Sequence, residues 1–405
     1  MISVEEALES VLNRARARAP ITVSLAEGLG RVLAEDITSD IDSPPHDKSL
    51  VDGYAVLAAD AKTTPVELVV SEEVMAGETP SRPLTTGEAT RIMTGAPIPV
   101  GADAIVMVEQ TELVDGSAAA VRLAKQQVQV GQHIMRRATS LRRGDVVLSK
   151  GARVRPIEIG LLAEVGRPKV SVFPPPKVAV LSTGNELVPV GDSPGAGQIR
   201  NSNGPMLGAL VQRAGGCHID LGIGRDDQDS LTQLVGQGLQ ADVLVLSGGV
   251  SAGALDLVPG VLASLGVAQV FHKVDLKPGK PVWFGVLADP TGDKLVFGLP
   301  GNPVSSLVCF ELFVRPAMAR LAGWSADRLA TQVARLTNDH QHRGDRPTYF
   351  PARLGLVDGQ SQVELLAWKG SADLRTLSSA DCLAFFPKGE RAYHAGDEID
   401  VVRFP

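Results

Sequence analysis

Five short polar segments between residues 184 and 306 hold most of the side chains that could do chemistry. Carboxylate oxygens are the ligands that Mg²⁺ prefers, and the ion shares them with the phosphate groups of a substrate. Lysine ammonium groups and the successive N–H groups of a glycine-rich turn bind phosphate. A segment that enters a helix adds the anion preference of the helix N-terminus. The residues with these properties are Glu186, Asp226, Asp227, Ser247, Gly248, Gly249, Ser251, Asp256, Lys273, Lys277, Lys280, Pro300, Gly301, Asn302, Pro303, Ser305 and Ser306.

The same segments follow the predicted strands of one α/β domain. VAVLST (178–183) is a short continuous apolar run, typical of a parallel strand buried on both faces. Further strand-like runs alternate with helical patterns at 203–215, 229–240 and 303–321. This alternation predicts a three-layer α/β/α sandwich. Because ligands bind beyond the carboxyl ends of the strands in such sheets, we expect the five segments to meet at one rim and to bind a phosphate-bearing ligand with a hard metal ion.

Each segment alone has a simpler explanation. SGGVS could be only a tight turn, LPGNPVS only a kinked helix start, and KPGKP only a solvated basic turn. Single acids such as Glu186, Asp226 and Asp256 are most often surface charges. Convergence on one rim favours a site, since independent turns need not be confined to it.

The rest of the chain predicts further domains, because 405 residues exceed one compact core. A capping-box pattern at Ser3 and Glu6 begins a predicted helix over 3–19. Short strand-like runs predict an inserted β-rich domain, and strand-like runs at the C-terminus predict a small β-barrel. Three consecutive prolines (174–176) mark a linker. The expected domains are 1–56 with 136–176 (N-terminal linking), 57–135 (inserted β-rich), 177–325 (α/β) and 326–405 (C-terminal β-barrel).

Composition excludes several classes of protein. A net charge of −7 and a pI near 5.6 argue against a nucleic-acid or anionic-membrane partner. The N-terminus does not resemble a signal peptide, and no apolar run approaches the length of a membrane span. The three widely spaced cysteines predict reduced thiols, so we expect a soluble cytoplasmic protein. The histidines form no zinc motif, His340 and His342 are expected in a solvated loop, and a serine-hydrolase elbow is missing.

The order and the residues of the motifs extend the interpretation of the α/β domain as a ligand-binding domain. STGNEL, SGGVSAGALD, KPGKP and GLPGNPVSS resemble the molybdopterin-binding domain shared by the MoeA, MogA and gephyrin proteins. AEGLGRVLAEDI, SPPHDKSLVDGYAV and RIMTGAPIPVGADAIVMVEQ are similar to MoeA-type segments that the smaller adenylyltransferases lack. GSADLRTLSSADCLAFFP resembles the fourth domain of the family. The chain thus resembles the MoeA/gephyrin E-domain family over nearly its whole length.

The resemblance also implies site residues. Matches to the family motifs are Asp52 (DGYA), Thr94 (TGAP), Glu186, Asp226, Asp256, Lys273, Lys277, Pro300, Pro303 and Ser371. The chain departs from the family at Leu50-Val51, where Ala-Met is usual, and at Ala252, Ala254 and Leu255, which alters the expected shape of the pocket. Asp52 and Thr94 lie outside the α/β domain, and the resemblance implies that a second subunit of a homodimer brings them to the rim.

The activity that the resemblance implies is insertion of molybdenum from molybdate into adenylylated molybdopterin, with release of AMP. Mg²⁺ would be the cofactor, held by Glu186, Asp226 and Asp256. A MogA-type adenylyltransferase and molybdoenzyme chaperones are the implied partners. Three alternatives remain open: ATP-dependent adenylylation of molybdopterin, a non-catalytic gephyrin-like scaffold, and a nucleotide hydrolase similar to CinA. The DGYA and TGAP segments weigh against the last.

Overall fold

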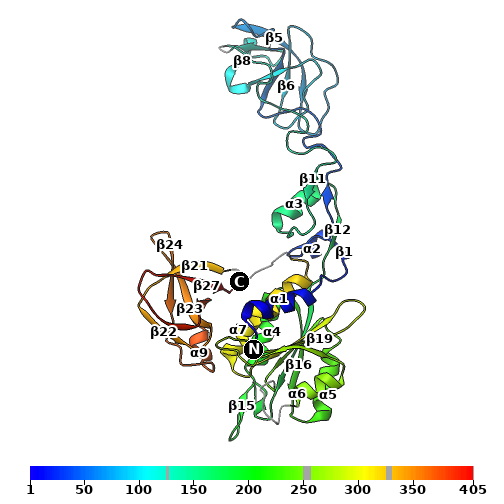
Figure 1. Cartoon of the computed structure of the whole chain (residues 1–405). Coiled ribbons are helices and arrows are strands. Elements are labelled where there is room, and N and C mark those ends of the chain that lie inside the picture. Colours follow the sequence, from blue (N-terminus) through cyan, green and yellow to red (C-terminus); the bar gives the residue numbers. More distant parts are fainter. Residues whose placement is uncertain (125–126, 250–256, 325–330, 405) are drawn as a thin grey trace. The chain divides into compact units, whose positions relative to one another are not determined.

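The computed structural model describes residues 1–124, 127–249, 257–324 and 331–404. The chain divides into two compact units, Met1–Glu35 with Gly151–Arg155 and Lys169–Pro405, and Asp36–Lys150 with Pro156–Pro168. Each unit is described by itself. Figure 1 shows the elements of both along the chain.

A six-stranded sheet forms the centre of the first unit. Its order is β16-β13-β17-β20-β19-β18. β13, β16, β17 and β20 are parallel, and β19 is antiparallel to both of its neighbours, so β18 runs in the same direction as β20. Five strands therefore end at one edge of the sheet. The bounds are β13 Lys177–Thr183, β16 Cys217–Gly224, β17 Val243–Ser247, β18 Ala268–His272, β19 Trp283–Leu287 and β20 Lys294–Leu299.

Helices cover both faces of this sheet, as predicted for a three-layer sandwich (Figure 1). α5 (Gln228–Gly238) and α6 (Val258–Ser264) pack on one face. The other face carries α1 (Val4–Arg14), α4 (Asn203–Arg213), α7 (Pro303–Cys309), the π-helical η3 (Phe310–Val314) and α8 (Arg315–Leu321). The central position of the sheet agrees with the apolar strands β13 and β17, in which all residues except Lys177 are buried.

The first helix is shorter than predicted. Ser3 and Glu6 form the expected capping box, but α1 ends at Arg14 rather than at residue 19. Beyond it the chain is extended, and Arg18 explains why: its backbone N–H donates to Leu321 O and its guanidinium binds Asp242 at 2.9 Å. These tertiary contacts replace the last helical turn. α1 buries Val4, Ala7 and Val11 in the core of the α/β domain.

A closed five-stranded barrel ends the first unit, as predicted for the C-terminus. Its strands are β21 Thr331–Leu336, β24 Gln360–Leu365, β23 Thr348–Val357, β25 Cys382–Phe386 and β27 Glu398–Arg403. Tyr349, Leu383 and Val402 of the barrel belong to the same hydrophobic core as α1. Smaller elements of the unit are β1 Ile21–Ser24 paired with β12 Lys169–Val172, α2 Leu25–Gly28, β14 Leu187–Val188 paired with β15 Ile199–Arg200, β22 His340–Gly344 paired with β26 Gly389–Tyr393, and α9 Leu374–Leu377.

His340 and His342 correct one expectation from the sequence. Both lie in β22 rather than in a solvated loop, and His342 is only 5% exposed. The His342 ring stacks on Phe386 with the centroids 5.2 Å apart. Burial lowers the pKa of both imidazoles. The alternation of buried and exposed residues in β22 thus places the two histidines in a strand despite their polar side chains.

A second six-stranded sheet, β7-β4-β6-β5-β9-β8, forms the core of the second unit. β4 pairs with both β6 and β7, although the domain boundary predicted from the sequence falls just after it, at residue 56. The bounds are β4 Gly53–Val56, β5 Val66–Val74, β6 Glu88–Ile92, β7 Ala104–Met107, β8 Thr111–Leu113 and β9 Ala120–Leu123. The unit also contains β2 Ile37–Thr38, β3 Lys48–Ser49, η1 Val108–Gln110, η2 Val114–Gly116, β10 Ile134–Met135, β11 Val146–Leu148 and α3 Pro156–Glu164.

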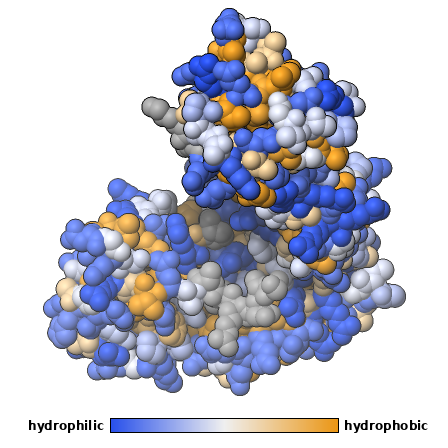
Figure 2. Space-filling view, turned by 90° about the horizontal axis from the view of Figure 1, so that it is seen from above, coloured by the Kyte–Doolittle hydropathy of each residue, from blue (hydrophilic) through white to orange (hydrophobic). Residues whose placement is uncertain are grey.

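The face of the molecule in Figure 2 is mostly hydrophilic, with apolar side chains in scattered groups. Among the described residues, no helix combines the length and apolarity needed to cross a bilayer.

Candidate functional site

The polar segments predicted to converge do lie at one edge of the α/β sheet. Across the rim, Asp226 follows β16, Glu186 follows β13, Gly248 follows β17, Gly301 follows β20 and Lys273 follows β18. Asp226 and Lys273 therefore stand at opposite ends of the same rim. Ser251 and Asp256 lie outside the described residues.

A cavity of about 250 Å³ opens on the middle of this rim. Predicted residues Glu186, Ser247, Gly301, Asn302 and Pro303 line it. Other parts of its wall come from the ends of the neighbouring elements and from the C-terminal region, namely Ser182, Thr183, Leu187, Ile199, Arg200, Asn201, Ser202, Asn203, Ala372 and Leu374.

The exposed carboxylates of Glu186 and Asp226 occupy neighbouring turns at the cavity. Asn185 and Asp226 are joined reciprocally: each backbone N–H donates to the side-chain oxygen of the other, at 3.1 Å in both directions. The Glu186 carboxylate folds back over Gly184, where a Cβ atom would collide with it. Glycine at 184 thus leaves the space that this acid occupies. The described residues contain no group of three acidic, histidine or cysteine side chains arranged to hold a metal ion.

The turn after β17 brings its backbone unusually close to β13. Gly248 and Gly249 have φ angles of +94° and +64°, which other residues rarely adopt. A Cβ atom on Gly248 would lie 2.5 Å from the backbone oxygen of Thr183. The Gly248 N–H donates to Leu299 O at 3.0 Å, which ties the turn to the end of β20. The predicted close approach of backbone is therefore present at these two glycines.

The turn after β20 contacts the C-terminal region. Asn302 Nδ2 donates to Ser371 Oγ at 2.9 Å, and Val304 N–H donates to Ser371 O at 3.0 Å. Ser371, predicted from the fourth-domain motif, is thus joined to the rim. Ser305 is only 4% exposed and does not line the cavity, so the structure gives it a place in the core beneath the turn. Pro300 supplies the carbonyl that accepts from Ser306 Oγ.

The three predicted lysines lie apart from the cavity. Lys273 directly follows β18 and has a φ angle of +72°. Lys277 is held against the barrel, because its N–H donates to Pro347 O and its carbonyl accepts from Tyr349 N–H, both at 2.8 Å. Lys280 is exposed. The segment is on the predicted rim but at the β18 end, so its charges do not line the cavity wall.

Sequence reasoning missed the segment Arg200–Asn203, which lines the cavity just before α4. Asn201 Oδ1 accepts from Ser182 Oγ and from Gly204 N–H, each at 3.0 Å. Asn203 Nδ2 donates to Ser247 Oγ at 2.8 Å and to Gly301 O at 2.7 Å. The signal was the Asn-Ser-Asn triplet at a helix start, which also serves as an ordinary cap.

Asp52 and Thr94 meet in the second unit. Asp52 directly precedes β4 and Thr94 follows β6. Both Thr94 N–H and Thr94 Oγ1 donate to Asp52 Oδ1 at 2.7 Å. These hydrogen bonds lower the pKa of the exposed Asp52 carboxyl, and the bond from the Thr94 hydroxyl has the largest effect. Thr94, 42 positions further along the chain, thus favours the ionised form of the Asp52 carboxyl.

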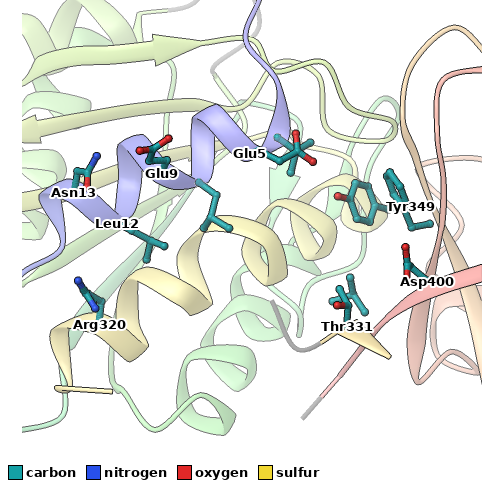
Figure 3. A pocket seen from close by; sticks show the side chains of 12 residues that line it. Glu5, Glu9, Leu12, Asn13, Arg320, Thr331, Tyr349 and Asp400 are labelled. Atoms are coloured by element: carbon teal, nitrogen blue, oxygen red, sulfur yellow. The ribbon is translucent and has the colours of Figure 1, made fainter. Parts of the chain in front are cut away.

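A larger cavity of about 820 Å³ lies between α1 and the barrel (Figure 3). Glu5 and Glu9 of α1 face it from one side, and Tyr349 and Asp400 from the other. None of the rim residues lines it. The smaller cavity is therefore the candidate site, because five of the predicted rim residues line it.

The three-layer domain and the appended β-structures define the class of protein. Residues 179–320 match the family model described as "Probable molybdopterin binding domain". Residues 2–166 match "MoeA N-terminal region (domain I and II)", and residues 333–404 match "MoeA C-terminal region (domain IV)". The chain is therefore a multidomain protein built around a domain of the molybdopterin-binding type.

Full-length relatives narrow the class to one family. The chain is 35% identical to a molybdopterin molybdenumtransferase of Staphylococcus aureus (strain Mu50 / ATCC 700699), covering 99% of this chain and 95% of the relative. It is 33% identical to the molybdopterin molybdenumtransferase of Bacillus subtilis (strain 168), covering 99% and 94%. The solved molybdopterin biosynthesis MoeA protein from Pyrococcus horikosii superposes with a TM-score of 0.85 at 36% identity, covering 100% and 99%. The chain belongs to the molybdopterin molybdenumtransferase (MoeA) family.

Proposed function

We propose that this protein inserts molybdenum from molybdate into adenylylated molybdopterin and releases AMP. The observation that carries the proposal is the full-length similarity to named transferases in both MoeA-specific regions and the α/β domain. The rim supports it, because acids, a glycine turn and hydroxyls surround a cavity at the place where α/β sheets bind ligands.

We propose Mg²⁺ as the cofactor, held by Glu186, Asp226 and Asp256. The first two residues fit, since they offer exposed carboxylate oxygens on adjacent turns and form no ion pair with a described residue. When bound, the ion would offset the negative charge on the phosphoanhydride and on departing AMP. Asn185 orients Asp226 through the paired hydrogen bonds described above.

The remaining groups bind and orient substrate in this proposal. Gly248 and Gly249 admit a phosphate close to the backbone, and Ser247 donates a hydrogen bond to it. Lys273 and Lys277, at the β18 end of the rim, attract the molybdate oxyanion. The dithiolene sulfurs of the substrate capture molybdenum, so no protein thiolate is needed. Two of the three free cysteines agree, because Cys309 and Cys382 are buried and burial raises the pKa of both thiols; Cys217 is exposed.

The Asp52–Thr94 pair completes the proposed site from the second subunit of a homodimer. Support comes from its ionised, exposed carboxylate, whose Oδ1 accepts both bonds from Thr94. We place the homodimer in the cytoplasm, where a MogA-type adenylyltransferase would supply the substrate and molybdoenzyme chaperones would take the product.

The decisive experiment supplies the purified protein with adenylylated molybdopterin, Mg²⁺ and molybdate. AMP release and reconstitution of an apo molybdoenzyme are then measured. Asp226→Asn should lower AMP release about 100-fold, by removing a metal ligand. Asp229→Asn, an exposed acid in the first turn of α5, is the matched control and should remain active. Full activity of both variants would contradict the metal site.

Two other outcomes assign a different function. Adenylylated product formed from ATP and metal-free molybdopterin would indicate the preceding adenylylation step. Substrate binding without AMP release or metal insertion would indicate a scaffold.

A further inference from the structure

The Asn203 amide links the ends of two strands at the rim. Asn203 begins α4, lines the cavity and is 8% exposed. Its Nδ2 donates to Ser247 Oγ, at the last residue of β17, and to Gly301 O, in the turn after β20. A backbone carbonyl can only accept, so Gly301 fixes which end of the amide faces the rim. Nδ2 must point at both partners, and Oδ1 must point away.

This orientation determines the polarity of the Ser247 hydroxyl. Both amide hydrogens of Asn203 are in use, and Ser247 Oγ accepts one of them. The hydroxyl proton of Ser247 therefore remains for another acceptor. The described residues provide none, although Ser247 is only 2% exposed. Since Ser247 lines the cavity, a ligand oxygen there can accept its proton.

Asn203 holds this position at a cost to folding. Its Oδ1 is buried without a hydrogen-bond partner among the described residues, and so is Thr183 Oγ1 on the same cavity. A buried carbonyl oxygen without a donor disfavours the folded state, and an apolar side chain of similar shape would avoid that penalty. The gain from asparagine must therefore come from its two N–H donors.

We propose that Asn203 is a positioning residue of the reaction: it directs the Ser247 O–H toward a phosphate oxygen of the substrate. The same amide sets the place of the Gly301 turn beside that phosphate. This inference rests on the proposed function, since it assigns the phosphate of adenylylated molybdopterin to the Ser247 side of the cavity.

Asn203→Asp tests the polarity directly, because the shape is kept while a donor becomes an acceptor. The carboxylate would accept the Ser247 proton and repel Gly301 O. We expect kcat/KM for AMP release to fall about 100-fold at about pH 8, because the hydrogen bond with Ser247 reverses and the one to Gly301 O is lost. A buried carboxyl protonates readily and can then donate to Gly301 O, so activity relative to wild type should recover toward about pH 6. The other charged groups on the cavity, Glu186 and Arg200, are present in both proteins, so the comparison with wild type isolates the effect of the new carboxyl.

Asn203→Ala separates positioning from packing. It removes the donor but leaves Ser247 able to rotate, so kcat/KM should fall only about tenfold, without the pH recovery. In a double-mutant cycle with Ser247→Ala, the losses should not add, because Asn203 acts through Ser247. Gln269→Leu removes one side-chain hydrogen bond, that from Trp283 Nε1, elsewhere in the same domain. It should change the melting temperature while leaving kcat/KM unchanged.

The outcomes distinguish a failure of the role of Asn203 from a failure of the proposed function. Asn203→Asp and Asn203→Ala could lose kcat/KM equally, without recovery at low pH and with additive effects of Ser247→Ala. That result would overturn the positioning role of Asn203 and leave the proposed function standing. Wild-type protein that releases no AMP would overturn the proposed function, and this assignment with it. Substrate titrations followed by calorimetry show in each case whether binding or turnover changed.

Discussion

Replacing Gly248 by alanine should disable the rim while leaving the fold in place. The new Cβ would lie 2.5 Å from Thr183 O, about 1 Å inside an ordinary contact, and the obstacle is backbone rather than a flexible side chain. The φ angle of +94° adds strain for any L side chain. Together these effects should cost roughly 1–3 kcal/mol of stability. A displacement of about 1 Å at a substrate-positioning turn lowers turnover about 100-fold.

The assay compares kcat/KM for AMP release with the free energy of unfolding in urea. Gly236→Ala, in α5, is the matched control, because a Cβ there meets nothing within 4 Å and its φ is helical. Alanine should stabilise that helix by up to about 1 kcal/mol and leave activity intact. If Gly248→Ala keeps wild-type kcat/KM, the turn does not hold the substrate, and the reasoning from close approach fails.

Two further predictions concern Thr94 and the buried Glu311. The Thr94 hydrogen bonds hold the Asp52 pKa below 3.8, so their contribution to stability is complete above that pH and is lost as pH falls through the lowered folded-state pKa. Thr94→Val should therefore raise the Asp52 pKa measured by NMR and lower turnover, whereas Thr94→Ser keeps both; an unchanged pKa in the valine variant would contradict the pairing. Glu311, 0% exposed, binds both Arg213 and Arg315 at 2.5 Å. Glu311→Gln should cost about 3 kcal/mol in urea unfolding, because it leaves two guanidinium groups without their anion, and a loss under 1 kcal/mol would show that water already screens them.

The sequence predicted the layers and the rim because those depend on repeated patterns. Apolar strand runs such as Val178–Thr183 can be buried on both faces only in a covered parallel sheet, and the carboxyl ends of such strands share an edge. The barrel followed from its strand-like runs in the same way. The convergence of Glu186, Ser247 and Gly301 on one cavity is the consequence of that topology.

Local patterns could not show what depends on contacts between distant segments. Arg18 ends the first helix early by binding residues more than 200 positions away. Asn203 stood only at the start of a predicted helix, and its bonds to Ser247 and Gly301 exist only once three distant segments are brought together. The place of Lys277 depends on its backbone pairing with the barrel, which no spacing within KPGKP encodes.

The position of α1 has a consequence for how the protein is made. Its apolar face, with Val4 and Val11, packs in a core with η3 and α8, about 300 residues further along the chain. At ribosomal rates of about 5–20 residues per second, roughly 15–60 s separate the synthesis of these partners. During that interval the face of α1 lacks these partners, so the nascent chain carries a hydrophobic segment of the kind that chaperones protect. A separately expressed fragment beginning at residue 177 would lack this helix, and its α/β core would be left with an open groove.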